Sequence, residues 1–181
     1  VKHNMIWELE QICRKKSLKK AFSEAEYDKK LFLNVNPMVM HDIKFREGFT
    51  RQYLKHYKVS PDKIIFEVTE RNAVSDIESF QGAIEHYKEQ LYEIAVDDAG
   101  AGYSGLNLIC DIKPHYIKLD MKLIRDIDKI SIKSAMVKSM IELSHLTNIK
   151  LIAEGIETAE ELTTLINLGV QYGQGYFIQK P

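Results

Sequence analysis

The sequence predicts an α/β fold built on a mostly parallel sheet, and three observations support this prediction. Short apolar segments alternate with amphipathic segments of helical spacing along the chain. Several apolar segments contain almost no polar residue, which is typical of parallel strands covered on both faces. The 181 residues contain no linker or low-complexity tract, so we expect one domain, residues 1–181. Strict alternation leaves two architectures open, a doubly wound sheet and a (β/α) barrel.

The first half of the chain predicts three helices and two strands. In chain order they are helix 5–22, strand 30–37, helix 45–57, strand 63–70 and helix 75–90. Pro37 ends the first strand, Pro61 precedes the second, and Ser75 is a candidate N-cap. Helical spacing predicts that the first helix buries a face made of Met5, Ile6, Leu9, Ile12 and Cys13.

The second half continues the same alternation. Its expected elements are strand 92–98, a short helical stretch after Gly105, strand 116–120, helix 131–147, strand 150–155, helix 158–169 and strand 173–181. Pro114 precedes the fourth strand, and Gly169 is the expected stop of the last helix.

Composition argues against several classes of partner. The net charge of −1 gives no attraction to nucleic-acid polymers or to a membrane surface. We find no apolar run long enough to span a bilayer and no signal-peptide pattern, although Val1 suggests that the natural N-terminus lies upstream. Cys13 and Cys110 fit no metal or redox spacing, and we expect both to be reduced core residues. These features together predict a cytoplasmic protein.

Every predicted strand carries a polar residue near one end of the sheet. In chain order they are Asn34, Glu67 and Glu70, Asp97 and Asp98, Lys118 and Asp120, Glu154 and Glu157, and Gln174 at the start of the sixth strand. In (β/α) barrels the carboxyl end of the strands holds the active site. A single polar strand end is common, whereas six in succession, mostly acidic, indicate a functional site.

Carboxylates gathered at one end of a sheet repel each other unless a cation lies among them. Oxygen ligands without Cys or His favour a hard ion, Mg²⁺ or Mn²⁺. The adjacent Asp97 and Asp98 could serve two metals, and two metals about 3.5–4 Å apart are a common device for phosphodiester hydrolysis. Lys118 would supply positive charge beside a phosphate. The residues therefore predict a two-metal hydrolytic site.

Residues 94–109, IAVDDAGAGYSGLNLI, also contain a G-x-G-x-x-G pattern at Gly100, Gly102 and Gly105. Together with Asp120 downstream, this pattern could indicate dinucleotide binding. The Asp97–Asp98 pair directly before the glycines would repel a pyrophosphate in the absence of a metal. We therefore interpret the glycines as a tight loop beside the metal site rather than as an NAD fingerprint.

Six segments resemble the successive motifs of the EAL domain family, in the same order. They are LFLNVNP, FEVTE, VDDAGAGYSGL, YIKLD, LIAEGIET and QGYFIQKP, from Leu31 to Pro181. The resemblance implies a modified TIM-like (β/α)₈ barrel of which about six βα units are present. It also implies metal-dependent hydrolysis of cyclic di-GMP to linear 5′-pGpG.

The resemblance assigns roles residue by residue. Asn34, Glu67 and Asp97 match the family's first metal site, and Asp97, Asp98 and Glu154 match the second. Glu154 also matches the residue assigned the base role, and Lys118 the lysine that steadies the attacking water. Supporting roles fall on Glu70, which anchors the loop after the third strand, and on Asp120, Glu157 and Gln174. A homodimer and an upstream regulatory domain in the same chain are further expectations.

The match also has departures. Ala99 and Ala101 stand where the family usually has Phe and Thr, and no Glu-Ala-Leu motif occurs. We therefore expect that the first two βα units, with one metal-ligating glutamate, are missing and that residues 1–181 alone are inactive. The alternative function is a degenerate EAL domain that senses cyclic di-GMP or binds a protein without catalysis.

Overall fold

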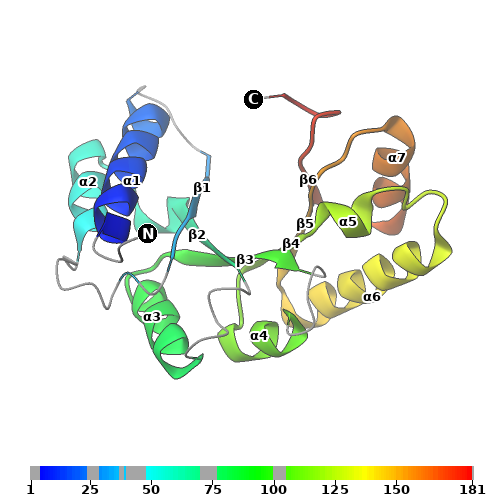
Figure 1. Cartoon of the computed structure of the whole chain (residues 1–181), viewed down its shortest axis with the longest axis horizontal. Helices are drawn as coiled ribbons and strands as arrows, with labels where there is room; N and C mark the ends of the chain where they lie inside the picture. Colours follow the sequence, from blue (N-terminus) through cyan, green and yellow to red (C-terminus); the bar gives the residue numbers. More distant parts are fainter. Residues whose placement is uncertain are drawn as a thin grey trace. The chain divides into compact units, whose positions relative to one another are not determined.

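The computed structural model describes residues 5–23, 29–36, 39, 48–69, 77–99 and 105–180. These residues form six strands, which stand in the sheet in chain order, β1 to β6 (Figure 1). The chain divides into two compact units, residues 1–94 and 95–181, and each is described by itself below.

The first unit contains helices and strands in alternation. They are α1 (Ile6–Phe22), β1 (Leu31–Asn34), α2 (Phe49–Tyr57), the 3₁₀ helix η3 (Pro61–Lys63), β2 (Ile64–Thr69) and α3 (Ile77–Glu89). β1 and β2 pair in parallel, with Leu33 beside Phe66 and Asn34 beside Glu67. The predicted helices and strands of this half are therefore confirmed where the structure describes them, whereas Pro37 and the expected cap Ser75 lie outside the described residues.

The buried face of α1 differs from the predicted one. Its buried residues are Trp7, Arg14, Leu18 and Phe22. Arg14 is only 4% exposed because its guanidinium pairs with Glu10 at 2.7 Å, donates to Thr50 Oγ1 at 3.0 Å and lies over the ring of Phe66. An arginine paired in this way can thus occupy a core position that hydrophobic spacing alone assigns to other residues.

The predicted apolar face of α1 is consequently wrong in part. Met5, Leu9 and Ile12 are exposed. Cys13 and Cys110 are free thiols, as expected, but both are exposed rather than buried in the core. Cys13 directly precedes Arg14, so the orientation that buries Arg14 turns Cys13 toward solvent.

The second unit begins within β3 (Glu93–Ala99). It continues with α4 (Gly105–Ile112), β4 (Tyr116–Leu119), α5 (Met121–Ile124), α6 (Ser131–Thr147), β5 (Lys150–Ala153), α7 (Ala159–Leu168) and β6 (Tyr172–Gly173). β3 pairs with β4, β4 with β5, and β5 with β6, all in parallel. The strand predicted over 173–181 is wrong over most of its length, because β6 ends at Gly173 and residues 176–178 form a turn.

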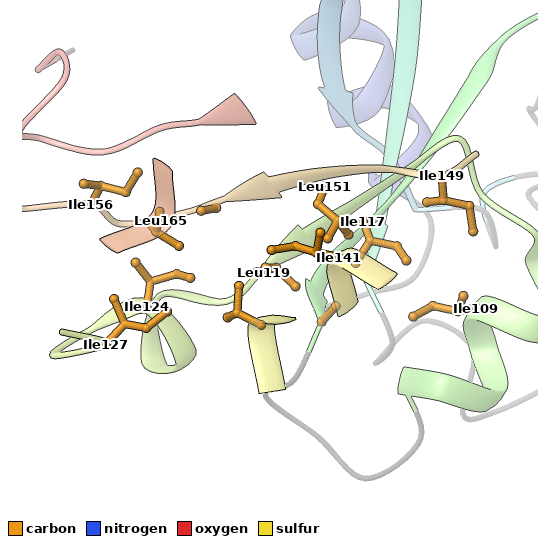
Figure 2. Packing of buried hydrophobic residues seen from close by; sticks show 13 residues of the cluster. Ile109, Ile117, Leu119, Ile124, Ile127, Ile141, Ile149, Leu151, Ile156 and Leu165 are labelled. Carbon is orange, nitrogen blue, oxygen red and sulfur yellow. The ribbon is translucent and has the colours of Figure 1, made fainter. Parts of the chain in front are cut away.

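The core of the second unit lies between its strands and the helices α6 and α7. Figure 2 shows Ile117 and Leu151, from β4 and β5, near Ile141 of α6. Ile124 and Leu165 belong to the same cluster and join α5 and α7 to it. Thr158 caps α7, and Gly169, in a left-handed conformation with φ +97°, ends it as predicted. This packing fixes the strand ends that carry the polar residues.

Among the described helices, none is both long enough and apolar enough to cross a lipid bilayer.

Candidate metal centre

Asp97 and Asp98 lie near the end of β3, where the strand departs from regular geometry. The register with β4 shifts between Val96 and Ala99, and Asp98 has a left-handed backbone with φ +58°. In a regular strand, consecutive side chains point to opposite faces of the sheet. An irregularity of this kind re-aims side chains, and Asp tolerates the left-handed region better than most residues. It allows two adjacent carboxylates to contribute to the same site.

Three carboxylates of the second unit come together at this place. Ligand atoms of Asp97, Asp98 and Glu154 lie within 4.8 Å of one another, and all three residues are partly buried. We call these three residues the acidic cluster. Glu154 follows the last residue of β5, and its N–H donates to the carbonyl oxygen of Leu119 at 3.1 Å. The donor set consists of oxygens alone, which suits Mg²⁺ or Mn²⁺.

Lys118 of β4 connects two members of the acidic cluster. Its ammonium lies 3.0 Å from Asp97 Oδ1 and 2.6 Å from Glu154 Oε1, and the residue is only 5% exposed. A buried ammonium between two carboxylates offsets part of their repulsion. The Gln174 amide donates a hydrogen bond to the same oxygen, Glu154 Oε1. The structure therefore brings together five of the residues selected from the sequence.

Glu154 differs electrostatically from an ordinary glutamate. Burial raises the pKa of its carboxyl to about 7, although Lys118 lowers it, and the neighbouring Asp97 raises it further. A carboxyl with a pKa near neutrality can accept and release a proton at the pH of a cell. Binding of a cation by the acidic cluster would favour the ionised form of the same group.

The raised pKa predicts a pH effect on stability in the absence of metal. Because the pKa of Glu154 is about 7 in the folded chain and 4.5 in the reference state, the folded state binds this proton more tightly. The contribution of Glu154 to the free energy of unfolding is therefore complete below pH 4.5, and it is lost as the pH rises through about 7. Urea unfolding with a chelator present should show this loss in the wild type but not in Glu154→Gln. Equal pH profiles for the two proteins would contradict the assignment.

Two predicted ligands lie in the first unit. Asn34 ends β1, and Glu67 in β2 is its Cα partner, so the two residues are neighbours at the same end of this pair of strands. Asn34 is exposed, whereas Glu67 is buried. Their participation in a metal site together with Asp97 stays a prediction. Glu70, predicted to anchor a loop, lies outside the described residues, as do Gly100 and Gly102.

Asp120 and Glu157 have structural partners rather than places in the acidic cluster. The Asp120 carboxylate accepts a hydrogen bond from the N–H of Lys122 at 2.6 Å and caps the short helix α5. The Glu157 carboxylate forms an ion pair with Arg125 at 2.7 Å. Both therefore stabilise the segments that follow β4 and β5, and the supporting role in the site stays a prediction for both.

Two residues near the site, Glu161 and Arg125, were not selected from the sequence. Glu161, in the first turn of α7, is 2% exposed and contacts Arg125 and the segment after β5. The sequence contains a signal for one part of this arrangement, because Thr158 and Glu161 match the pattern of a capping box. No local pattern indicates the contact with Arg125, which lies 36 residues away.

Comparison with known proteins gives this arrangement a context. The family model for the EAL domain matches residues 2–181. The chain belongs to the EAL domain family. This membership confirms the resemblance inferred from the six motifs.

The chain is similar to proteins named as phosphodiesterases. The probable cyclic di-GMP phosphodiesterase PdeA of Escherichia coli (strain K12) is 35% identical over 127 residues, which cover 70% of this chain and 17% of that protein. The chain thus spans less than a fifth of the length of that relative.

Solved EAL structures share the fold. The c-di-GMP-bound form of a standalone versatile EAL protein from Vibrio cholerae O395 is 33% identical, with a TM-score of 0.88 over 100% of this chain and 76% of that one. A manganese and cyclic di-GMP complex of BlrP1 from Klebsiella pneumoniae is 28% identical, with a TM-score of 0.88 over 98% of this chain and 45% of that one. The predicted fold class, an α/β fold related to the TIM-like EAL barrel, is confirmed.

Proposed function

We propose that the protein hydrolyses one phosphodiester bond of cyclic di-GMP to give linear 5′-pGpG, in a reaction that needs Mg²⁺ or Mn²⁺. The observation that carries this proposal is the acidic cluster with Lys118 among its carboxylates. Family membership supports it, as do the solved relatives bound to the same nucleotide. In this reaction water adds to phosphorus and the bond to the 3′ oxygen breaks, which leaves a 5′ phosphate and a 3′ hydroxyl.

The proposed reaction gives these residues metal-binding and electrostatic roles. Asp97, Asp98 and Glu154 would hold the metal, with Asn34 and Glu67 as further ligands. The metal would supply Lewis-acid stabilisation of the negative charge that develops on the phosphate oxygens. Lys118 places a positive charge at the same point.

Proton transfer falls to the Glu154 carboxyl. The resemblance to the EAL motifs gives Glu154 the base role toward the attacking water, and Gln174 holds that carboxyl in place through its amide. Glu154 would thus serve both as a metal ligand and in proton transfer.

The proposal also includes the oligomeric state, the place of action and the domain organisation of the protein. We expect a homodimer that acts in the cytoplasm, without a nucleic-acid polymer or a membrane as partner of this domain. An upstream regulatory domain in the same chain remains part of the hypothesis.

Ligand binding tests the proposal separately from catalysis. Cyclic di-GMP with Ca²⁺, a hard ion that we use as a non-catalytic substitute, should raise the melting temperature of the full-length protein. At a ligand concentration 100 times the Kd, the expected gain in stability is about 2.7 kcal/mol. NAD and NADP should give no shift. A shift with NAD alone would restore the dinucleotide interpretation, and no shift with cyclic di-GMP would contradict the proposal.

Turnover then distinguishes the enzyme from a sensor. Chromatography after incubation with Mg²⁺ or Mn²⁺ should show 5′-pGpG formed from cyclic di-GMP. Binding without product under either ion would assign the protein to the alternative class, a non-catalytic EAL domain.

A further inference from the structure

The loop between β5 and α7 carries Glu154 and is held at both ends. At its start, the N–H of Glu154 donates to Leu119, the last residue of β4. At its end, the N–H groups of Glu157 and Thr158 both donate to Glu161 Oε2, at 2.9 Å and 3.3 Å. A single carboxylate oxygen thus fixes the second half of the loop.

The other oxygen of Glu161 bonds a different part of the chain. Glu161 Oε1 accepts a hydrogen bond from the N–H of Asp126 at 3.1 Å and lies 3.5 Å from Arg125 Nη1. Burial alone would raise the pKa of this carboxyl, but the backbone N–H donors and Arg125 outweigh burial and hold the pKa below its usual value. The side chain is therefore a charged connection between two segments that are far apart in sequence.

The segment on the far side of this connection is itself firmly held. Residues 125–129 form the turn after β4 and α5. The Lys133 ammonium donates to the carbonyl oxygens of Lys122 and Arg125, each at 2.6 Å, and Ser134 Oγ donates to the carbonyl oxygen of Ile127 at 2.7 Å. α6 thereby fixes the turn that contacts Glu161.

From these contacts we infer that Glu161 is a positioning residue, which holds the loop bearing Glu154 against the turn after β4 so that Glu154 reaches the acidic cluster. Lys118 of β4 and Glu154 of this loop already meet through their side chains. Arg125 strengthens the same connection by its ion pair with Glu157. This inference rests on the proposed function, because Glu154 is assigned there to metal binding and proton transfer.

A plain helix cap does not explain the arrangement. Thr158 and Glu161 do form a capping box at the start of α7. A capping box needs one acceptor oxygen from the glutamate. The second oxygen, which faces Arg125 and Asp126, and the near-complete burial of the side chain are additional. These two features make the inference testable by separating the cap from the long-range contact.

Three variants of the full-length protein separate the two roles. Thr158→Ala removes only the bond from the Glu161 N–H to the Thr158 hydroxyl, Glu161→Ala removes the glutamate's half of the cap and the long-range contact, and Glu161→Gln can keep a carbonyl acceptor for the cap. In Glu161→Gln, however, the amide NH₂ would face the Asp126 N–H and the Arg125 guanidinium, both of which are donors. For each variant the readouts are thermal stability, Mn²⁺ affinity by calorimetry, and kcat and KM for cyclic di-GMP.

We expect Glu161→Ala and Glu161→Gln to lower Mn²⁺ affinity and kcat by roughly 10-fold, as for other residues that support metal ligands. The KM for cyclic di-GMP should change little. Thr158→Ala should lose thermal stability but keep the Mn²⁺ affinity and kcat of the wild type. If Glu161→Ala does not fold, Glu161→Gln carries the test.

Two outcomes would overturn the inference. One is wild-type Mn²⁺ affinity and kcat in Glu161→Gln, and the other is the same loss in Thr158→Ala as in the Glu161 variants. If the wild type binds Mn²⁺ but does not hydrolyse cyclic di-GMP, the proposed function fails, whereas Mn²⁺ affinity still decides the role of Glu161. If the wild type does not bind Mn²⁺, both proposals fail.

Discussion

Asp97→Asn should lower the rate of cyclic di-GMP hydrolysis by about 100-fold or more, which corresponds to at least about 2.7 kcal/mol of transition-state stabilisation. Asp97 belongs to the acidic cluster and contacts Lys118 at 3.0 Å. Asparagine has nearly the same shape but lacks the charge, so metal affinity and the alignment of Lys118 are both lost. The resemblance to the EAL motifs predicts that Asp97 contributes to both metal sites, so we expect this position to be the most sensitive in the cluster.

The measurement compares kcat at saturating Mn²⁺ with the unfolding midpoint in urea. The fold should be little affected, because removing one of several neighbouring carboxylates also removes repulsion. Asp111→Asn is the matched control, since Asp111 is exposed on α4 and lies outside the acidic cluster. Near-normal turnover in Asp97→Asn would contradict the metal assignment, and an equal loss in Asp111→Asn would show that the effect is not specific.

Much of the fold was predictable because each strand and most helices depend on local pattern. The segment 131–147 has helical spacing throughout, and α6 occupies it from end to end. α5 was not predicted, because its four residues make only about one helical turn, which is too short for helical spacing to be recognised. The face of α1 was predicted wrongly because the burial of Arg14 depends on Glu10, Thr50 and Phe66, and two of these partners lie in other elements.

The site was predictable in its residue types but not in its geometry. Parallel strands align their carboxyl ends, so Asp97, Lys118 and Glu154 could be expected to meet. The left-handed backbone of Asp98, which accompanies a shift in strand register, has no local sequence signature. The contacts of Glu161 with residues 125–126 also could not be predicted from local sequence pattern, because they depend on how two loops pack.

Gly155→Ala should lower the free energy of unfolding by about 2–4 kcal/mol, from the combined cost of a left-handed alanine and of overpacking. Gly155 directly follows Glu154 and has φ +67°. A Cβ atom at this position would lie 2.4 Å from Met121 Cβ, so α5 or the loop must move. Since that loop carries Glu154, the affinity for Mn²⁺ should fall together with stability.

Gly169→Ala provides the matched control for this prediction. Gly169 ends α7 with φ +97°, and a Cβ atom there would meet no atom within 4 Å. This control therefore isolates the conformational cost, about 1–2 kcal/mol, from the collision with Met121. Urea unfolding of both variants measures the loss of stability, and Mn²⁺ titration measures the loss of metal affinity. An equal loss of stability in the two, with Mn²⁺ affinity intact in Gly155→Ala, would show that the approach of residue 121 to residue 155 does not constrain the position of Glu154.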